Sequence, residues 1–259
     1  MTKQTDWKVV CIAFILLLVP VQTSAQKPAQ QISPKQTVVI VHGAWGGAWA
    51  FRNVEALLRD KGYNVYRPQL TGLGERVHLA SADIGLSTHI EDVVNTILYE
   101  ELDDIILVGH SYGGMVITGV AHRVPERIRQ LVYLDAMVPR DGESLRSIVG
   151  KLKPMIQGDY VVPSWVKPDQ KPPKDVPQPL KTFTEPLSLK NETARKISAT
   201  YILTVEQGKE ANEDDFYAQS QRAKENGWTI LQLTADHNPQ WSAPQALVKM
   251  LDEIVRPKK

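Results

Sequence analysis

One stretch, residues 109–114 (GHSYGG), constrains this chain more than any other. A hydrophobic run over 105–108 leads into it, and small and apolar side chains over 114–123 follow. This order is typical of a strand, a sharp turn and a helix, with Ser111 at the apex of the turn. Positions 109 and 113 are glycine, and we expect that a side chain at either would strike the neighbouring strand or helix.

Such a turn holds the Ser111 hydroxyl above the sheet, with the N-terminus of the next helix directed at it. That setting favours a catalytic nucleophile. The alternative is an ordinary glycine-rich turn between a strand and a helix, as in a nucleotide-binding fold. The chain contains neither G-x-G-x-x-G nor G-K-[ST], which disfavours this alternative.

The remaining chain alternates short β-branched runs with segments of helical spacing. Strands are predicted over 37–41, 64–67, 105–108, 128–135, 200–205 and 228–233, and helices over 49–61, 89–101, 114–123, 214–226 and 244–255. Alternation without hairpin signals predicts an α/β fold, with a mostly parallel sheet and helices on both faces. Ligands of such sheets bind at the carboxyl ends of the strands.

Residues 139–198 interrupt this alternation, because prolines are dense between 154 and 186. Regular α/β units do not tolerate such a density. The segment lies between two predicted strands at the edge that carries Ser111, so we predict a cap over the site. Trp165 and Phe183 are its candidate pocket or packing aromatics. A disordered excursion is the alternative, on the strength of the composition.

The N-terminus has the pattern of a signal peptide. Lys3 and Lys8 precede an apolar run over 9–19 that is short for a membrane span, and small residues stand at 23 and 25. We expect cleavage after Ala25 and export to the bacterial periplasm or medium, without stable membrane association afterwards. An uncleaved anchor is the alternative. Residues 26–36 have no periodicity and are expected to be a flexible lead-in to one domain over 37–259.

Composition excludes some classes of function. Lys and Arg total 30 and Asp and Glu total 29, so the net charge of +1 offers no basic footprint for nucleic acid. The one cysteine, Cys11, lies in the apolar run, so the exported chain would contain none. No histidine pair has metal-ligand spacing, and no cofactor is implied. Nothing in the sequence indicates an oligomeric state.

A serine nucleophile needs a base, and His237 is the candidate. It follows the last predicted strand directly, where a loop can return over the sheet edge towards Ser111. The chain order serine, acid, histidine is typical of one class of hydrolase. His42 and His110 are expected to shape the turns around the site. His78, His89 and His122 are expected on loops or helix surfaces.

The acid that would orient His237 has two candidates at strand ends. Glu206 follows the strand predicted over 200–205, and Asp135 ends the strand predicted over 128–135. Either carboxylate could fix the imidazole tautomer and stabilise the imidazolium. Asp236 is disfavoured because it points away from its neighbour in an extended segment. The choice between Glu206 and Asp135 stays open.

An oxyanion hole requires backbone donors near the nucleophile. The amide of Tyr112 begins the helix after Ser111, and the amide of Ala44 lies in the loop after the first strand. Glycines at 43, 46 and 47 leave that loop backbone free to approach a substrate. Ala44 and Tyr112 are therefore the predicted oxyanion donors.

At this point the residues resemble a known family. Residues 39–45 (VIVHGAW), 109–114 and 235–237 resemble the α/β-hydrolase superfamily, in the small esterase branch with plant methylesterases, plant hydroxynitrile lyases and bacterial carboxylesterases. Residues 70–76 and 134–136 also resemble the bacterial enzymes, whereas the cap matches weakly. The resemblance implies an α/β-hydrolase fold and a serine hydrolase.

Two departures from the family bear on the chemistry. The cyanide-releasing relatives carry threonine and lysine where this chain has Gly43 and Asn238, so the resemblance implies hydrolysis rather than lyase chemistry. The methylesterase branch has aspartate after the penultimate strand, where this chain has Glu206 and a longer loop, which keeps Asp135 open as the acid.

The leading hypothesis is a serine carboxylesterase that acts on a small, apolar ester through an acyl-enzyme. Its partner is a small-molecule ester. Trp45 and Trp241 near the site, with the cap aromatics, are consistent with an apolar acyl or alcohol group, and core packing is an equal alternative for each of them. The alternatives are a carbon–carbon lyase of the hydroxynitrile lyase type and a non-catalytic ligand-binding module on the same fold.

Overall fold

The computed structural model describes residues 36–150 and 155–255. The predicted signal peptide and nearly all of the lead-in lie outside the described residues. The described residues all belong to one compact unit. No helix in the described ranges is long and apolar enough to cross a membrane.

Six strands form one sheet at the centre of this unit. They are β1 (Thr37–Val41), β2 (Asn64–Tyr66), β3 (Ile105–His110), β4 (Ile128–Leu134), β8 (Ser198–Val205) and β9 (Thr229–Thr234). Their order is β2-β1-β3-β4-β8-β9, and every neighbouring pair is parallel. The predicted parallel sheet is confirmed, with strand ends shifted by one or two residues.

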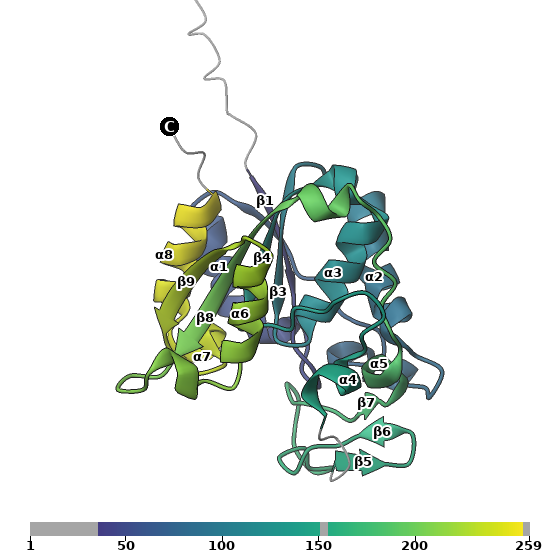
Figure 1. Cartoon of the computed structure of the whole chain (residues 1–259). Coiled ribbons are helices and arrows are strands. Elements are labelled where there is room, and N and C mark those ends of the chain that lie inside the picture. The colour runs from purple at the N-terminus through teal and green to yellow at the C-terminus, as the bar shows by residue number, and fades with distance from the viewer. Residues whose placement is uncertain (1–35, 151–154, 256–259) are drawn as a thin grey trace, which may run out of the picture. The chain divides into compact units, whose positions relative to one another are not determined.

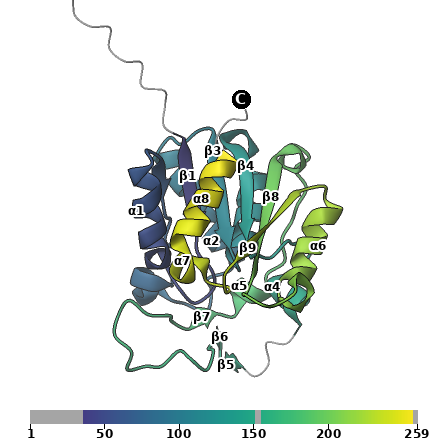
Figure 2. The same ribbon diagram turned by 90° about the vertical axis from the view of Figure 1, so that its left-hand side faces the viewer.

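Helices cover both faces of the sheet (Figures 1 and 2). The helices α1 (Arg52–Asp60) and α8 (Pro244–Val255) contact each other on one face, where Leu58 and Leu251 are buried with the apolar side chains of β1. The helices α2 (Leu86–Tyr99), α3 (Gly113–Arg123) and α6 (Tyr217–Glu225) pack on the other face. Two apolar layers therefore sandwich strands that are buried on both sides.

The Pro-rich segment folds as a cap beyond the carboxyl ends of the strands (Figures 1 and 2). It contains α4 (Leu145–Val149), α5 (Lys181–Thr184) and an antiparallel sheet of β5 (Ile156–Gln157), β6 (Tyr160–Val161) and β7 (Gln178–Pro179). The sequence contains no hairpin signal and predicted only the parallel sheet, so this small antiparallel sheet corrects that prediction. Its strands are too short for alternation to reveal them.

Candidate active site

Ser111 lies in a strained turn between β3 and α3. Its φ of 54° is left-handed, which is uncommon for a residue with a side chain. The turn is crowded as expected: a Cβ added at Gly109 would lie 2.7 Å from the Gly113 carbonyl oxygen, and one at Gly113 would lie 2.6 Å from that of Val41. The glycines therefore allow the packing that projects the Ser111 hydroxyl from the carboxyl end of the sheet.

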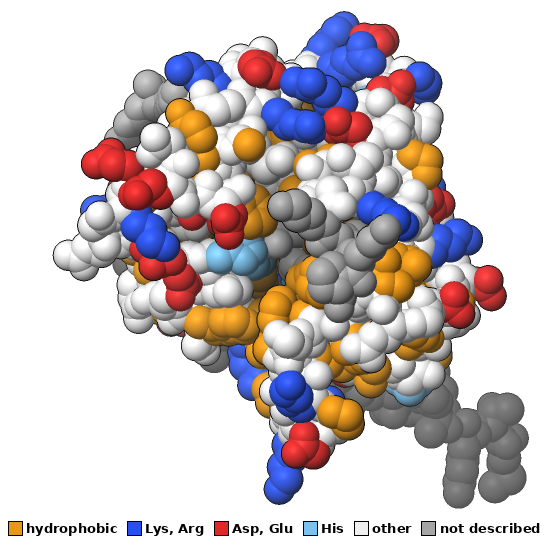
Figure 3. Space-filling view, turned by 60° about the horizontal axis from the view of Figure 1, so that its bottom comes forward, with side chains coloured by type: hydrophobic (Ala, Val, Ile, Leu, Met, Phe, Trp, Pro, Cys, Tyr) orange, Lys and Arg blue, Asp and Glu red, His pale blue; other side chains and the backbone are white. Residues whose placement is uncertain are grey.

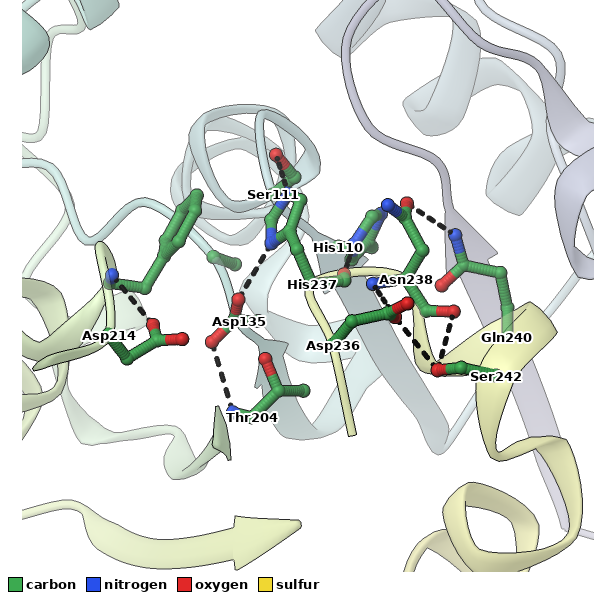
Figure 4. A network of polar contacts seen from close by, with 12 residues as sticks. His110, Ser111, Asp135, Thr204, Asp214, Asp236, His237, Asn238, Gln240 and Ser242 are labelled. Atoms are coloured by element: carbon green, nitrogen blue, oxygen red, sulfur yellow. Dashed lines mark hydrogen bonds and ion pairs between the residues drawn. The ribbon is translucent and has the colours of Figure 1, made fainter. Parts of the chain in front are cut away.

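His237 and Asp135 complete a chain of hydrogen bonds to this hydroxyl (Figure 4). The distance from Ser111 Oγ to His237 Nε2 is 3.0 Å, and the His237 Nδ1 lies 2.7 Å from Asp135 Oδ2. These bonds assign the roles: the hydroxyl donates to Nε2, and Nδ1–H donates to the carboxylate. Three residues from three strand ends thus form a continuous proton path.

Asp135, rather than Glu206, is the carboxylate that reaches His237. It follows β4 directly, is completely buried, and accepts a second hydrogen bond of 3.1 Å from the Thr204 backbone amide. Glu206 points elsewhere, because its carboxylate pairs with Lys209 at 2.9 Å and is half exposed. The expectation that Glu206 could face His237 is therefore corrected: it lies just beyond β8, where its carboxylate pairs with Lys209. Asp236 is exposed and accepts bonds from Asn238 and Ser242.

Two rings hold the imidazole of His237. Phe216 stacks on it, with centroids 4.5 Å apart and planes within 13°. His110 Nε2–H donates a 2.8 Å hydrogen bond to the His237 backbone carbonyl, which fixes the returning loop over Ser111. Phe216 precedes α6 in a long loop, and no spacing in the sequence connects it to the site.

The loop after β1 is fastened to the cap through Trp45. Gln178 Oε1 accepts a 2.8 Å hydrogen bond from the Trp45 amide, and the Trp45 carbonyl accepts one of 2.9 Å from Val176. Trp45 Nε1 also donates to the Val161 carbonyl at 3.1 Å. Trp45 is in the left-handed region, with φ of 61°, so these bonds hold a conformation that costs free energy. Gln178 is fully buried, and sequence reasoning did not single it out.

The two predicted oxyanion donors lie on different elements. Ala44 lines the cavity in front of Ser111, and Tyr112 follows Ser111 as the N-cap of α3. Within the described ranges, neither amide donates a hydrogen bond to another backbone group, as the predicted role requires.

Three histidines near the site are buried as neutral rings. Burial lowers the pKa of His42 to about 4, that of His89 to about 4 and that of His110 to about 3. The expectation that His89 lies on a helix surface is wrong. Its ring is fully buried, donates from Nε2 to the Thr71 carbonyl and accepts from the Tyr112 hydroxyl at Nδ1, both at 2.9 Å.

A cavity of about 150 Å³ opens in front of Ser111 and His237. Trp165 from the cap and Trp241 from α7 (Pro239–Ser242) line it, and each is about half exposed. Trp165 meets Trp45 edge to face at 5.5 Å, whereas Phe183 is buried against Trp45. Hydrophobic side chains gather on this end of the molecule (Figure 3). In the described ranges no group of three or more potential ligands is placed to hold a metal ion.

The parallel sheet and the arrangement of Ser111, His237 and Asp135 indicate one class of protein, and comparisons with known proteins indicate the same class. The profile of the alpha/beta hydrolase family matches residues 38–250, and the chain belongs to this family. A carbendazim hydrolyzing esterase from Nocardioides sp. (strain SG-4G) is 38% identical over 237 residues, which cover 82% of this chain and 97% of that protein.

Two further proteins are more distant. Putative methylesterase 11, chloroplastic, of Arabidopsis thaliana is 28% identical over 254 residues, covering 84% of this chain and 63% of that protein. The solved structure of an extracellular alpha/beta-hydrolase from a Paenibacillus species has a TM-score of 0.66 and 23% identity, covering 86% of this chain and all of that one. The likeness to this solved structure shows the fold alone. The esterase relatives support a hydrolase and ester hydrolysis in general.

Proposed function

We propose that this protein is a serine carboxylesterase. The observation that carries the proposal is the unbroken hydrogen-bond path from Asp135 through His237 to Ser111. A serine hydroxyl is a weak nucleophile unless a neighbouring base removes its proton as it attacks. His237 is placed for that task, and the buried Asp135 stabilises the imidazolium that forms.

The proposed reaction has two halves. The Ser111 oxygen attacks the ester carbonyl while its proton passes to His237 Nε2, and the amides of Ala44 and Tyr112 hold the resulting oxyanion. His237 then protonates the alcohol as it leaves, which produces the acyl-enzyme. Water then attacks the acyl carbonyl while it gives a proton to His237, and His237 returns that proton to the Ser111 oxygen as the bond to the acyl group breaks and the acid leaves.

The cavity supports a small and largely apolar ester as the substrate. Its volume of about 150 Å³ is low for a ligand site, and Trp165 and Trp241 supply apolar walls. The named activity of the Nocardioides relative, carbendazim hydrolysis, shows that a related chain accepts a small molecule. We propose that this site takes ligands of that size.

Gly43 argues against the lyase alternative. A Cβ at this position would lie 3.1 Å from both Ser111 Cβ and His110 Nδ1, so the turn has no room for a larger side chain without a shift. The residue after the proposed base is Asn238, which carries no charge to stabilise a departing anion such as cyanide.

The test compares wild type with Ser111→Ala on short-chain aryl esters. We expect wild-type turnover, a loss of about 10³-fold or more in kcat for the variant, and stoichiometric labelling of Ser111 by an active-site phosphonate. Ser188→Ala, at an exposed serine of the cap, is the matched control and retains activity. Equal turnover by wild type and Ser111→Ala would remove the proposal, and tight ester binding without turnover would favour the binding module.

We also propose that the protein is exported. The basic, apolar and small-residue order over 1–25 supports this, although those residues lie outside the described ranges. The N-terminal sequence of protein recovered from the periplasm or medium tests it. We expect the chain to start at Gln26, and recovery of the intact N-terminus in the membrane fraction would favour the anchor instead.

A further inference from the structure

An acidic side chain of the cap faces the cavity in which Ser111 lies. Asp175 stands between β6 and β7, and among the described residues that line this cavity it alone is acidic. No lysine or arginine of the described ranges lines the cavity, and burial holds two of its histidines, His42 and His110, neutral at pH 7. The Asp175 carboxylate therefore dominates the charge that a bound molecule meets opposite the sheet edge.

The two oxygens of Asp175 have different surroundings. Oδ2 accepts a 3.0 Å hydrogen bond from the indole N–H of Trp165, which fixes the carboxylate. Oδ1 lies beside the backbone of Gly46, 3.5 Å from where a Cβ would stand, and takes part in no hydrogen bond or ion pair within the described ranges. The neighbouring Lys174 ammonium does not pair with it, since it donates to the Pro168 carbonyl.

Asp175 is half-buried at the rim of the cavity, and its bond to Trp165 lies near the surface. Partial burial raises the pKa of Asp175, because the carboxylate has lost some of its hydration and one indole bond replaces only part of it. Oδ1 therefore remains open to water or to a donor group of a molecule that enters the cavity.

We propose that Asp175 determines substrate specificity by accepting a hydrogen bond from a donor group, above all an N–H, that the ester carries away from its scissile carbonyl. The substrate class is then small, largely apolar esters with an N–H donor, neutral or cationic. Esters that carry a carboxylate there are selected against, because two like charges would face each other across the cavity. This inference rests on the proposed esterase function.

The surrounding aromatic groups fit the same ligand. Trp165 lines the cavity with its N–H committed to Asp175, and Trp241 stacks one ring face on Trp49, so a face of Trp165 and the other face of Trp241 remain for apolar or cationic groups. Asp175 and the oxyanion donor Ala44 line the cavity together, with Gly46 between Ala44 and the cap. A substrate held by the oxyanion donors can therefore reach the carboxylate with a short arm.

The experiment compares esters in pairs whose two members differ only in having N–H or CH₂ at one position. On the acyl side, 4-nitrophenyl N-acetylglycinate is compared with 4-nitrophenyl 4-oxopentanoate, which has CH₂ in place of N–H. On the alcohol side, 4-acetamidophenyl acetate is compared with 4-(2-oxopropyl)phenyl acetate, and 4-carboxyphenyl acetate is the anionic member. We expect wild type to favour the N–H member about tenfold in kcat/KM in one pair or both, and to disfavour the anion.

The readout is the ratio within each variant, which does not depend on its overall activity. In Asp175→Leu the ratio falls to about one, and in Asp175→Asn the penalty against the anionic ester decreases. Asp169→Leu, at an exposed acid of the same cap segment, keeps the wild-type ratio. A wild-type ratio near one, or an unchanged ratio in Asp175→Leu, overturns this inference while ester turnover continues. Absence of turnover of every ester overturns the proposed function instead.

Discussion

The sheet edge and the cap enclose one cavity, but they are built differently. Ser111, Asp135 and His237 follow β3, β4 and β9, which parallel pairing connects through β8, with one register shift at the start of β3. The cap contains strands of two residues, and it is fastened to the site largely through Trp45. Under the proposed function, we infer a division of tasks: the sheet positions the reacting groups, and the cap selects the substrate and holds the loop of the predicted oxyanion donor Ala44.

The largest expected effect tests the sheet side of this comparison. Asp135→Asn keeps the shape of the side chain but favours the wrong tautomer of His237, so we expect kcat to fall about 10⁴-fold on aryl esters. Steady-state kinetics measures the change. Glu206→Gln is the matched control, and we expect it to stay within about twofold of wild type. A comparable loss in both variants would contradict the assignment of Asp135.

The same division explains what the sequence could predict. Residues that follow buried parallel strands meet at one edge of the sheet, so Ser111 and His237 could be placed near each other from order alone. Asp135 and Glu206 both follow strands, and only the rotation of each strand end decides which carboxylate faces the imidazole. That rotation depends on the φ of 43° at Asp135 and on its bond to Thr204, which no local pattern encodes.

The cap was less predictable for a related physical reason. Its prolines showed that regular α/β units end there, but its structure depends on single long-range bonds such as Gln178 to Trp45, 133 positions apart. The burial of His89 escaped prediction similarly, since the Tyr112 hydroxyl and Thr71 carbonyl that satisfy its ring lie on other elements. Helical periodicity alone cannot separate a buried, paired histidine from an exposed one.

A pair of glycine substitutions compares how the two regions tolerate added volume. A Cβ at Gly114 would lie 2.2 Å from the Met137 carbonyl oxygen, so we expect Gly114→Ala to lower the free energy of unfolding by about 3 kcal/mol. Gly158, in the turn between β5 and β6, has a φ of 58° and open space around it, so Gly158→Ala should cost only about 1 kcal/mol. Urea denaturation measures both, and equal costs would show that the cap is packed as tightly as the sheet edge.

The dependence of stability on pH tests the packing behind the nucleophile, because His89 is hydrogen-bonded to the Tyr112 hydroxyl next to Ser111. The pKa of His89 in the folded protein is about 4, below the ordinary value of 6.5, so the unfolded chain binds a proton first as the pH falls. The stability contribution is intact above about pH 6.5 and is lost towards pH 4. At pH 5 the loss from this one group is about 2 kcal/mol.

His89→Gln removes this titration whatever its general effect on stability. We therefore expect its unfolding free energy to fall about 2 kcal/mol less than that of wild type between pH 7 and pH 5. His78→Gln, at an exposed histidine, is the control and should follow wild type. Parallel pH dependence of wild type and His89→Gln would mean that the buried ring is protonated without cost.

The smallest expected effect tests the contact between the two regions. Gln178→Met keeps the length of the side chain but removes the acceptor for the Trp45 amide and the donor to Thr182. The left-handed Trp45 would then lose one of the bonds that hold the Ala44 amide towards the oxyanion. We expect kcat to fall about tenfold with KM nearly unchanged, because the loss concerns a group that binds the transition state.

A merely structural role for Gln178 would give a different pattern. If the bond serves the oxyanion hole, a boronic acid that forms a tetrahedral adduct with Ser111 should lose affinity by about the same tenfold factor, whereas the carboxylic acid product should bind as before. Gln157→Met, at an exposed cap residue, should alter neither. Equal losses for adduct and product would mean that the cap shapes the cavity as a whole. A selective loss for the adduct would show that the cap, although it contributes no reacting group, sets the geometry in which the sheet edge performs its chemistry.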